Sequence, residues 1–148
     1  FESRWLRTQW HISVYLPPDY DRDPHKLFPS LYVHDGSEYI TRAKLATVVD
    51  NLLHERAIVP LIVVLVDPVD RLREYRANED YAQAMEHELI PHIDRRYRTP
   101  AQREARGVGG FVEAVLRQAC VALHGDRHEH AHDRDAKDSH QSESLKQR

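Results

Sequence analysis

A histidine-rich segment near the end of the chain has a spacing typical of metal sites. His128, Glu129 and His132 form a literal His-Glu-x-x-His string. On an amphipathic helix this spacing places two imidazoles on one face for Zn²⁺, with the glutamate as general base. The flanking residues offer no apolar face, since they are Asp126, Arg127, Asp133, Arg134 and Asp135. We therefore predict no catalytic metal and no cofactor, and only weak binding of Ni²⁺ or Zn²⁺ by His128, His130 and His132.

Two other side chains could act as nucleophiles. Cys120 lies one helical turn before His124, and a neighbouring base can lower the pKa of a thiol. The alternative for Cys120 is a small apolar residue near the buried face of a helix. Ser37 follows Asp35 and Gly36 in a predicted exposed loop. We expect its role, if any, to be through its backbone.

The composition is that of one ordinary domain. The chain has 148 residues, is 41% hydrophobic and 30% charged, and carries a net charge of −3. No basic field attracts nucleic acid or anionic membrane, and no apolar run is long enough to span a bilayer. The single cysteine is compatible with the cytoplasm. Because the chain begins with Phe1 rather than Met, a preceding segment is left open.

Hydrophobic periodicity predicts strands that alternate with helices. Alternating or continuous apolar residues indicate strands at 10–16, 27–33, 61–66 and 104–108. Apolar residues spaced three and four apart indicate helices at 42–56, at 78–95 with an interruption at Pro91, and at 111–123. This alternation favours an α/β fold with a mainly parallel sheet of about four strands, flanked by helices.

Three loops follow predicted strands, at residues 34–39, 67–76 and 107–110. In sheets of this kind, function lies in loops at the carboxyl ends of the strands. The character of the chain changes at His124, where an almost wholly polar segment begins. We predict a folded domain over residues 1–123 and a disordered His-rich, charged tail over 124–148.

Several segments together resemble the esterase D and enterochelin esterase-like family, which belongs to the α/β-hydrolase superfamily. They occur in the family order and resemble its N-terminal half only. The segments are Val-Tyr-Leu-Pro-Pro-Asp-Tyr (14–20), Phe-Pro-Ser-Leu-Tyr-Val-His-Asp-Gly (28–36), Ile-Val-Val-Leu-Val-Asp (62–67) with Arg71 and Glu74-Tyr75, and Glu-Leu-Ile-Pro-His-Ile (88–93).

The resemblance implies a serine carboxylic-ester hydrolase. Members of the family cleave small-molecule esters, including siderophore lactones and feruloyl esters, with a serine, an acidic residue and a histidine in that order along the chain. It also implies that the backbone N–H of Ser37 contributes to the oxyanion hole. Asp35, Arg71 and Glu74 become candidates for lining the substrate cleft, the alternative being solvated loop residues.

The chain departs from the family where the nucleophile should stand. The serine is expected near Val108 and Gly109, in a Gly-x-Ser-x-Gly turn, and no such motif occurs in the sequence. No catalytic residue can therefore be assigned, and we expect this chain to be inactive. A frameshift near Arg106 or a deletion would explain the loss. The alternative is a non-enzymatic remnant or binding module. A sheet that lacks its later strands would also self-associate through its exposed edge.

Overall fold

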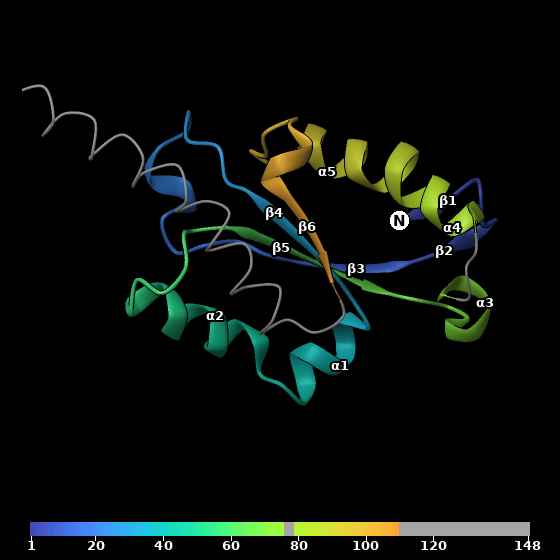
Figure 1. The fold of residues 1–148 in the computed structure, drawn as a ribbon, viewed down its shortest axis with the longest axis horizontal. Helices are drawn as coiled ribbons and strands as arrows, with labels where there is room; N and C mark the ends of the chain where they lie inside the picture. The colour runs from blue at the N-terminus through green and yellow to red at the C-terminus, as the bar shows by residue number, and fades with distance from the viewer. Residues whose placement is uncertain (76–78, 110–148) are drawn as a thin grey trace, which may run out of the picture.

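A four-stranded sheet lies between two layers of helices (Figure 1). The computed structural model describes residues 1–75 and 79–109. The sheet contains β3 (His11–Tyr15), β4 (Ser30–His34), β5 (Ile62–Asp67) and β6 (Arg106–Gly109). A small hairpin of β1 (Glu2–Ser3) and β2 (Thr8–Gln9) precedes it. The α-helices are α1 (Gly36–Thr41), α2 (Leu45–His54), α3 (Arg71–Tyr75), α4 (Glu79–Ala84) and α5 (Ile90–Arg96). Shorter turns are η1 (Tyr20–Arg22), η2 (Met85–Leu89) and η3 (Arg103–Ala105).

The strand order of the sheet is β3-β5-β4-β6. The central strand β5 is parallel to β4, which is parallel to β6, whereas β3 runs antiparallel to β5. The prediction of a mainly parallel sheet of about four strands is thus confirmed. Each predicted strand is present within a few residues of its expected bounds. The antiparallel direction of β3 was not predicted, because strand direction depends on the connection between strands and leaves no periodic pattern.

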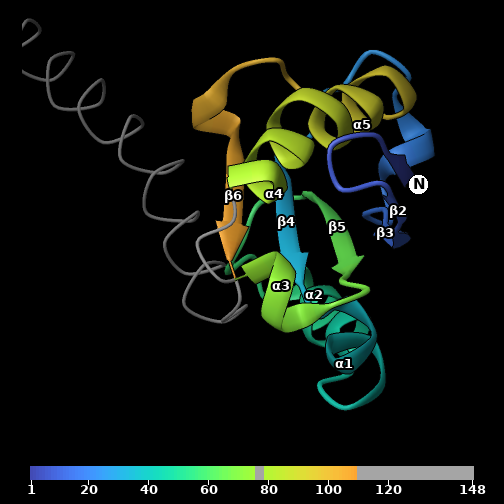
Figure 2. The ribbon, with the colours of Figure 1, turned by 90° about the vertical axis from the view of Figure 1, so that its right-hand side faces the viewer.

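Both faces of the sheet are buried. Side chains point alternately to the two faces along β5, and each set packs against helices. Ile62, Val64 and Val66 pack on one face against the helical segment α4–η2–α5. Val63 and Leu65 pack on the other face against α2. Figure 2 shows these helices on opposite sides of the strands. Burial on both sides therefore explains the continuous apolar run at 61–66.

The helical segment from 79 to 96 is interrupted as expected, at a turn shortly before Pro91. Regular α4 gives way to a π-helical turn, η2, and α5 begins at Ile90. Proline has no N–H to donate to the carbonyl of His87, and its ring crowds that carbonyl. The wider π turn lies directly before the proline, where that crowding would occur.

Several short elements were not predicted: the β1–β2 hairpin, α1, α3, η1 and η3. Each is too short to show a periodicity of its own. The expected helix at 111–123 and the predicted tail at 124–148 lie outside the described residues, as do Cys120 and the histidines of the His-Glu-x-x-His string. The proposed boundary at residue 123 stays a prediction.

Candidate functional site

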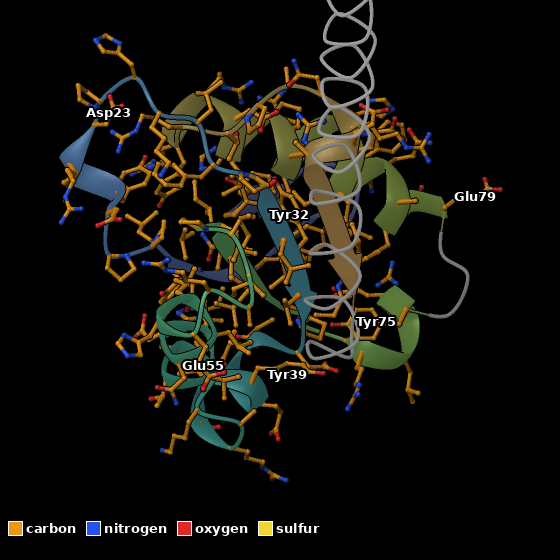
Figure 3. The ribbon with its side chains drawn as sticks, turned by 60° about the vertical axis from the view of Figure 1, so that its left-hand side comes forward. Asp23, Tyr32, Tyr39, Glu55, Tyr75 and Glu79 are labelled. Carbon is orange, nitrogen blue, oxygen red and sulfur yellow. The ribbon has the colours of Figure 1, made fainter. Side chains whose placement is uncertain are left out.

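The three loops that follow parallel strands meet at one edge of the sheet. In the register of the sheet, His34 of β4 is opposite Val66 of β5, and Val33 is opposite Gly109 of β6. The strands therefore end side by side. The turn at Asp35, the loop after Asp67 and the end of β6 share this edge, as the sequence predicted. Figure 3 shows Tyr75 of α3 beyond the strand ends and Tyr32 within the sheet.

The turn after β4 brings backbone groups close to the sheet. Asp35 has a left-handed φ of 57°, and α1 begins at the next residue, Gly36. A Cβ atom on Gly36 would lie 2.7 Å from the Cβ of Leu65, so only glycine fits between the turn and β5. This close approach places Ser37 next to the end of β5.

Asp67, the last residue of β5, binds Ser37 twice. The backbone N–H of Ser37 donates to Oδ1 at 2.7 Å and its hydroxyl donates to Oδ2 at 2.5 Å. His11 Nδ1 lies 3.2 Å from the same Oδ2. Burial acts to raise the pKa of Asp67, but the hydrogen bonds from Ser37 and His11 outweigh it, and the pKa is lowered. The carboxylate is therefore ionised at neutral pH and already occupies the N–H that we predicted for the oxyanion hole.

Asp35 is held by two partners from α3. The guanidinium of Arg71 lies 2.7 Å from Asp35 Oδ2. The Tyr75 hydroxyl donates to Asp35 Oδ1 at 3.3 Å and accepts from the Asp35 backbone N–H at 3.2 Å. Burial and the negative charge of Asp35 both raise the pKa of Tyr75, which stays protonated. Two of the predicted cleft residues, Asp35 and Arg71, are thus brought together at the strand ends.

The third predicted cleft residue, Glu74, is directed inward instead. Only 4% of it is exposed. One carboxylate oxygen accepts the Trp10 indole N–H at 2.8 Å, and the other accepts the backbone N–H groups of Val69 and Asp70 at 3.0 Å each. In the structure, Glu74 fixes the shape of the loop that carries Arg71, so its link to a cleft is indirect.

A group of rings fills the space behind Asp35. His34 lies 5.1 Å from the ring of Tyr75 and 5.6 Å from that of Tyr81, measured between centroids. The Tyr81 hydroxyl is 2.7 Å from His34 Nδ1. Burial lowers the pKa of His34, which favours the neutral imidazole. A neutral imidazole can accept a hydrogen bond from the Tyr81 hydroxyl at Nδ1. His34 is a packed residue at the strand end.

The end of β6 presents no side chain able to do nucleophilic chemistry. Val108 is 56% exposed, and Gly109 closes the strand beside Val33. The start of β6 is anchored by an ion pair of 2.5 Å between Arg106 and Asp94. Gly109, near which the nucleophile was expected, thus lies beside Val33, two residues before Asp35.

Sequence reasoning missed Trp10, His11 and Tyr81 as parts of this region. Their roles depend on the antiparallel pairing of β3 with β5, which places His11 opposite Asp67, and on the packing of α4. Neither leaves a local signal in the sequence. Within residues 1–75 and 79–109, no cluster of three or more His, Cys, Asp or Glu is arranged to hold a metal ion. No helix in the same ranges is long and apolar enough to cross a membrane.

Turns and loops gathered at the carboxyl ends of the strands, in a sheet that helices cover on both faces, define a protein of the α/β class. A family model described as "Putative esterase" matches residues 3–112. The match covers well over half of the 148 residues, and the chain belongs to this esterase family.

Solved esterase structures share the fold. A ferulic acid esterase matches with a TM-score of 0.62 at 21% identity, over 74% of this chain and 47% of that one. The enterobactin esterase from Shigella flexneri, solved in the presence of enterobactin, matches with a TM-score of 0.64 at 20% identity, over 72% of this chain and 27% of that one. The ferric enterobactin esterase from Salmonella typhimurium gives a TM-score of 0.63 at 18% identity, over 71% and 27%.

These comparisons confirm the predicted family and fold class. The chain spans 47% of the ferulic acid esterase and 27% of each enterobactin esterase. The family match covers the region of this chain that carries the strands.

Proposed function

We propose that this chain is the N-terminal part of a serine carboxylic-ester hydrolase for small-molecule esters. We further propose that the 148-residue polypeptide alone hydrolyses no ester. The first half of the proposal is supported by the esterase family match and by the strand-end turn that the fold builds. The second half rests on the sequence, which has no Gly-x-Ser-x-Gly motif.

One observation carries the proposal. The parallel register of β4 and β6 sets Gly109 beside Val33, two residues before Asp35. A nucleophile at the end of β6 would thus stand next to the Ser37 N–H. An acyl carbon attacked there could place its developing oxyanion on that N–H, which is the geometry that ester hydrolysis requires.

Asp67 sets a condition on this function. An N–H that donates to a carboxylate at 2.7 Å is not available to an oxyanion. A functional oxyanion hole requires Asp67 to move away from the Ser37 N–H, or another donor to take over. The oxyanion role of Ser37 therefore remains a prediction, and its test must vary Asp67.

A fluorophosphonate probe tests whether the chain is inactive. The whole chain, its Ser37→Ala variant and a heat-denatured sample would be incubated with the probe and analysed by intact mass. We expect no labelling, because the Ser37 hydroxyl donates to a carboxylate rather than to a histidine base. Labelling of the native chain that is lost in Ser37→Ala would make Ser37 the nucleophile and overturn the proposal of inactivity.

The coding DNA tests the ancestry of the site. It would be read in all three frames through and beyond codon 106. A shifted frame that yields a Gly-x-Ser-x-Gly turn, a later acid and a histidine should encode an esterase. That protein should hydrolyse 4-nitrophenyl acetate and lose the activity when the new serine is replaced by alanine. If no frame restores the motif, a non-enzymatic role takes precedence over catalysis.

A further inference from the structure

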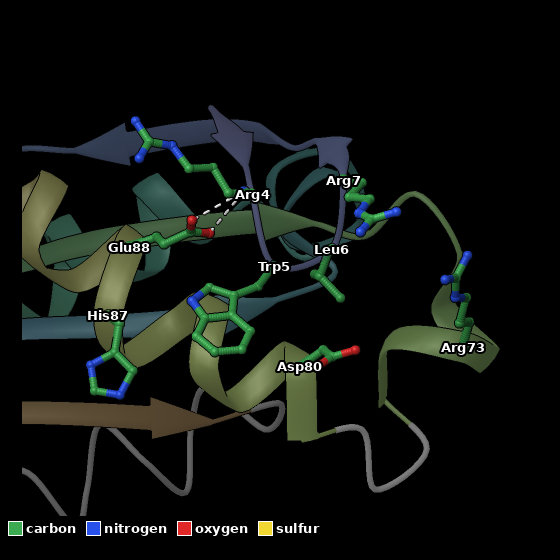
Figure 4. A pocket seen from close by; sticks show the side chains of 8 residues that line it. All are labelled: Arg4, Trp5, Leu6, Arg7, Arg73, Asp80, His87 and Glu88. Atoms are coloured by element: carbon green, nitrogen blue, oxygen red, sulfur yellow. Dashed lines mark hydrogen bonds between the residues drawn. The ribbon is translucent and has the colours of Figure 1, made fainter.

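A pocket lies between the β1–β2 hairpin and the helices, and neither Asp35 nor Ser37 lines it. It has a volume of about 700 Å³. The connection between β1 and β2 forms one wall, and α3, α4 and η2 form the others (Figure 4). The lining side chains are those of Arg4, Trp5, Leu6, Arg7, Arg73, Asp80, His87 and Glu88. A pocket of this size can hold a small molecule.

Arginine dominates the charge of this pocket. Arg7 comes from the hairpin and Arg73 from α3, and Figure 4 shows both at the same end of the pocket. Among the described residues, the Arg7 guanidinium makes no hydrogen bond or ion pair. Two guanidinium groups from separate elements can bind the two oxygens of one carboxylate, each with a charge-assisted hydrogen bond.

Trp5 supplies an apolar surface beside these charges. Its side chain projects into the middle of the pocket (Figure 4), and 47% of the residue is exposed. An indole left this open to water offers a π-face for stacking a planar ring. Leu6 lies beside it. The pocket thus combines a cationic end with an aromatic wall.

The pocket also carries two acidic residues, Asp80 and Glu88. Glu88 accepts the Ser3 hydroxyl at 2.8 Å and the Arg4 backbone N–H at 3.1 and 3.2 Å, so its charge is used to attach the hairpin to η2. Asp80 stands on α4 and opposes the arginines electrostatically. Three arginines against two carboxylates leave the lining positive by one charge, with His87 counted as neutral.

The hairpin is held in a defined shape. Ser3 is buried, and its hydroxyl also accepts the backbone N–H of Leu6 at 3.2 Å. Arg7 adopts a left-handed φ of 53°, which is unfavourable for a residue with a side chain. Such strain persists only where the surrounding contacts impose it, and it is common at ligand sites. The arginine is therefore presented by an ordered turn.

We propose that this pocket binds a small aromatic carboxylate, with the carboxylate on Arg7 and Arg73 and the ring on Trp5. The proposal goes beyond ester hydrolysis and does not depend on it, because binding requires no nucleophile. Failure of this binding would leave the proposed function unchanged, and the reverse also holds.

Benzoate is the probe, and the two indole N–H signals of the ¹⁵N-labelled full chain are the readout. Trp10 is buried and bound to Glu74, so its signal reports an intact fold, whereas the Trp5 signal reports the pocket. At constant ionic strength, benzoate should shift the Trp5 signal with a dissociation constant of about 1 mM, and the Trp10 signal should stay in place. Benzamide, which has the ring but no charge, should shift Trp5 far less.

Charge variants test the assignment of the carboxylate. The double variant Arg7→Gln/Arg73→Gln should raise the dissociation constant for benzoate about tenfold or more. The matched control is Arg22→Gln/Arg42→Gln, which removes two exposed arginines from η1 and the end of α1 and should leave binding unchanged. Asp80→Asn should tighten binding a few-fold, because it removes the opposing charge.

Three results would overturn the proposal. The first is a Trp5 signal that benzoate leaves unmoved in the native chain. The second is binding of benzamide as tight as that of benzoate. The third is a control pair that weakens binding as much as the pocket pair does. In every variant, an unchanged Trp10 signal shows that the fold is retained and that the comparison is valid.

Discussion

Two carboxylates stand near the two ends of the loop that follows β5, and they differ in the parts of the structure that they hold in place. Asp67 stands at the start of the loop, with 20% of its side chain exposed, and holds the turn after β4 through Ser37. Glu74 stands near its end and is buried. It accepts hydrogen bonds from the loop backbone and from Trp10, which lies between β2 and β3. Each accepts hydrogen bonds from three donor groups. The difference lies in what surrounds them.

Burial decides what each carboxylate contributes. A donor that loses its acceptor inside the protein cannot turn to water, so removal of Glu74 leaves the buried Trp10 indole N–H unpaired. The partners of Asp67 are exposed, and water can replace the carboxylate. We therefore expect Glu74 to act as a structural anchor and Asp67 as an exchangeable contact at the candidate site.

The replacement Glu74→Ala should have the largest effect. It removes the acceptor of the Trp10 indole and of two backbone N–H groups, and should lower the free energy of unfolding by about 3 kcal/mol. Urea denaturation measures this change. The control is Glu55→Ala, which removes an exposed carboxylate at the end of α2 and should alter stability by less than about 0.5 kcal/mol. A similar small change in both variants would contradict the comparison.

The replacement Trp10→Phe should cost less, about 2 kcal/mol. Glu74 keeps its two backbone donors, but the indole hydrogen bond and some packing against Tyr81 are lost. A double-mutant cycle of Trp10→Phe with Glu74→Ala isolates the energy of the indole–carboxylate contact. We expect a coupling of at least about 1 kcal/mol. Additive effects would show that the hydrogen bond contributes nothing to stability.

The replacement Asp67→Ala should cost about 1 kcal/mol at neutral pH, since Ser37 lies in the first turn of α1 and its N–H loses a capping acceptor. The folded-state pKa of Asp67 is lowered. The stabilisation is thus complete above the unfolded-state pKa of 3.8 and is lost as the pH falls through the folded value. The stability difference between native chain and variant, measured in urea at pH 7 and near pH 3, should shrink on acidification.

Ser37→Ala sharpens this result. It removes the hydroxyl donor but keeps the backbone N–H, so it should cost less than Asp67→Ala. A pH-independent difference between the native chain and Asp67→Ala would show that the Asp67 contact does not depend on its charge.

The replacement Arg71→Met should have the smallest effect, about 0.5 kcal/mol or less. Its ion pair with Asp35 is exposed on the arginine side, and Tyr75 continues to bind Asp35. Denaturation in low and high salt measures it, since salt screens such pairs. Arg42→Met, which breaks the exposed pair with Glu38, is the matched control. A loss well above that of the control would indicate that Arg71 orders the candidate site.

The strands and longer helices could be predicted because their side chains repeat. The run at Ile62–Val66 and the helical spacing of Leu45, Val49 and Leu52 each encode a buried face. Strand direction, the β1–β2 hairpin and the short helices could not be predicted, because a few residues carry no period. The π turn η2 illustrates an intermediate case, in which Pro91 revealed the interruption but not its form.

The candidate site was predictable as a place rather than as a set of contacts. The strand-end loops were expected at one edge, and Asp35, Arg71 and Ser37 do lie there. The binding of Ser37 by Asp67 depends on the register between β4 and β5, and the burial of Glu74 depends on Trp10, some 64 positions earlier. Such partners are set by tertiary packing, which no local sequence pattern reports.

Because the Ser37 backbone N–H donates to Asp67, this carboxylate competes with any external ligand for the same N–H. Because it is attached to the same fold, its effective concentration at the N–H is high and does not change on dilution. An oxygen from any external molecule must displace it before that donor can be shared. The Asp67 carboxylate therefore acts as an internal ligand of the turn after β4. The apparent affinity of this turn for an external oxygen ligand depends on the free energy needed to break the Ser37–Asp67 hydrogen bond.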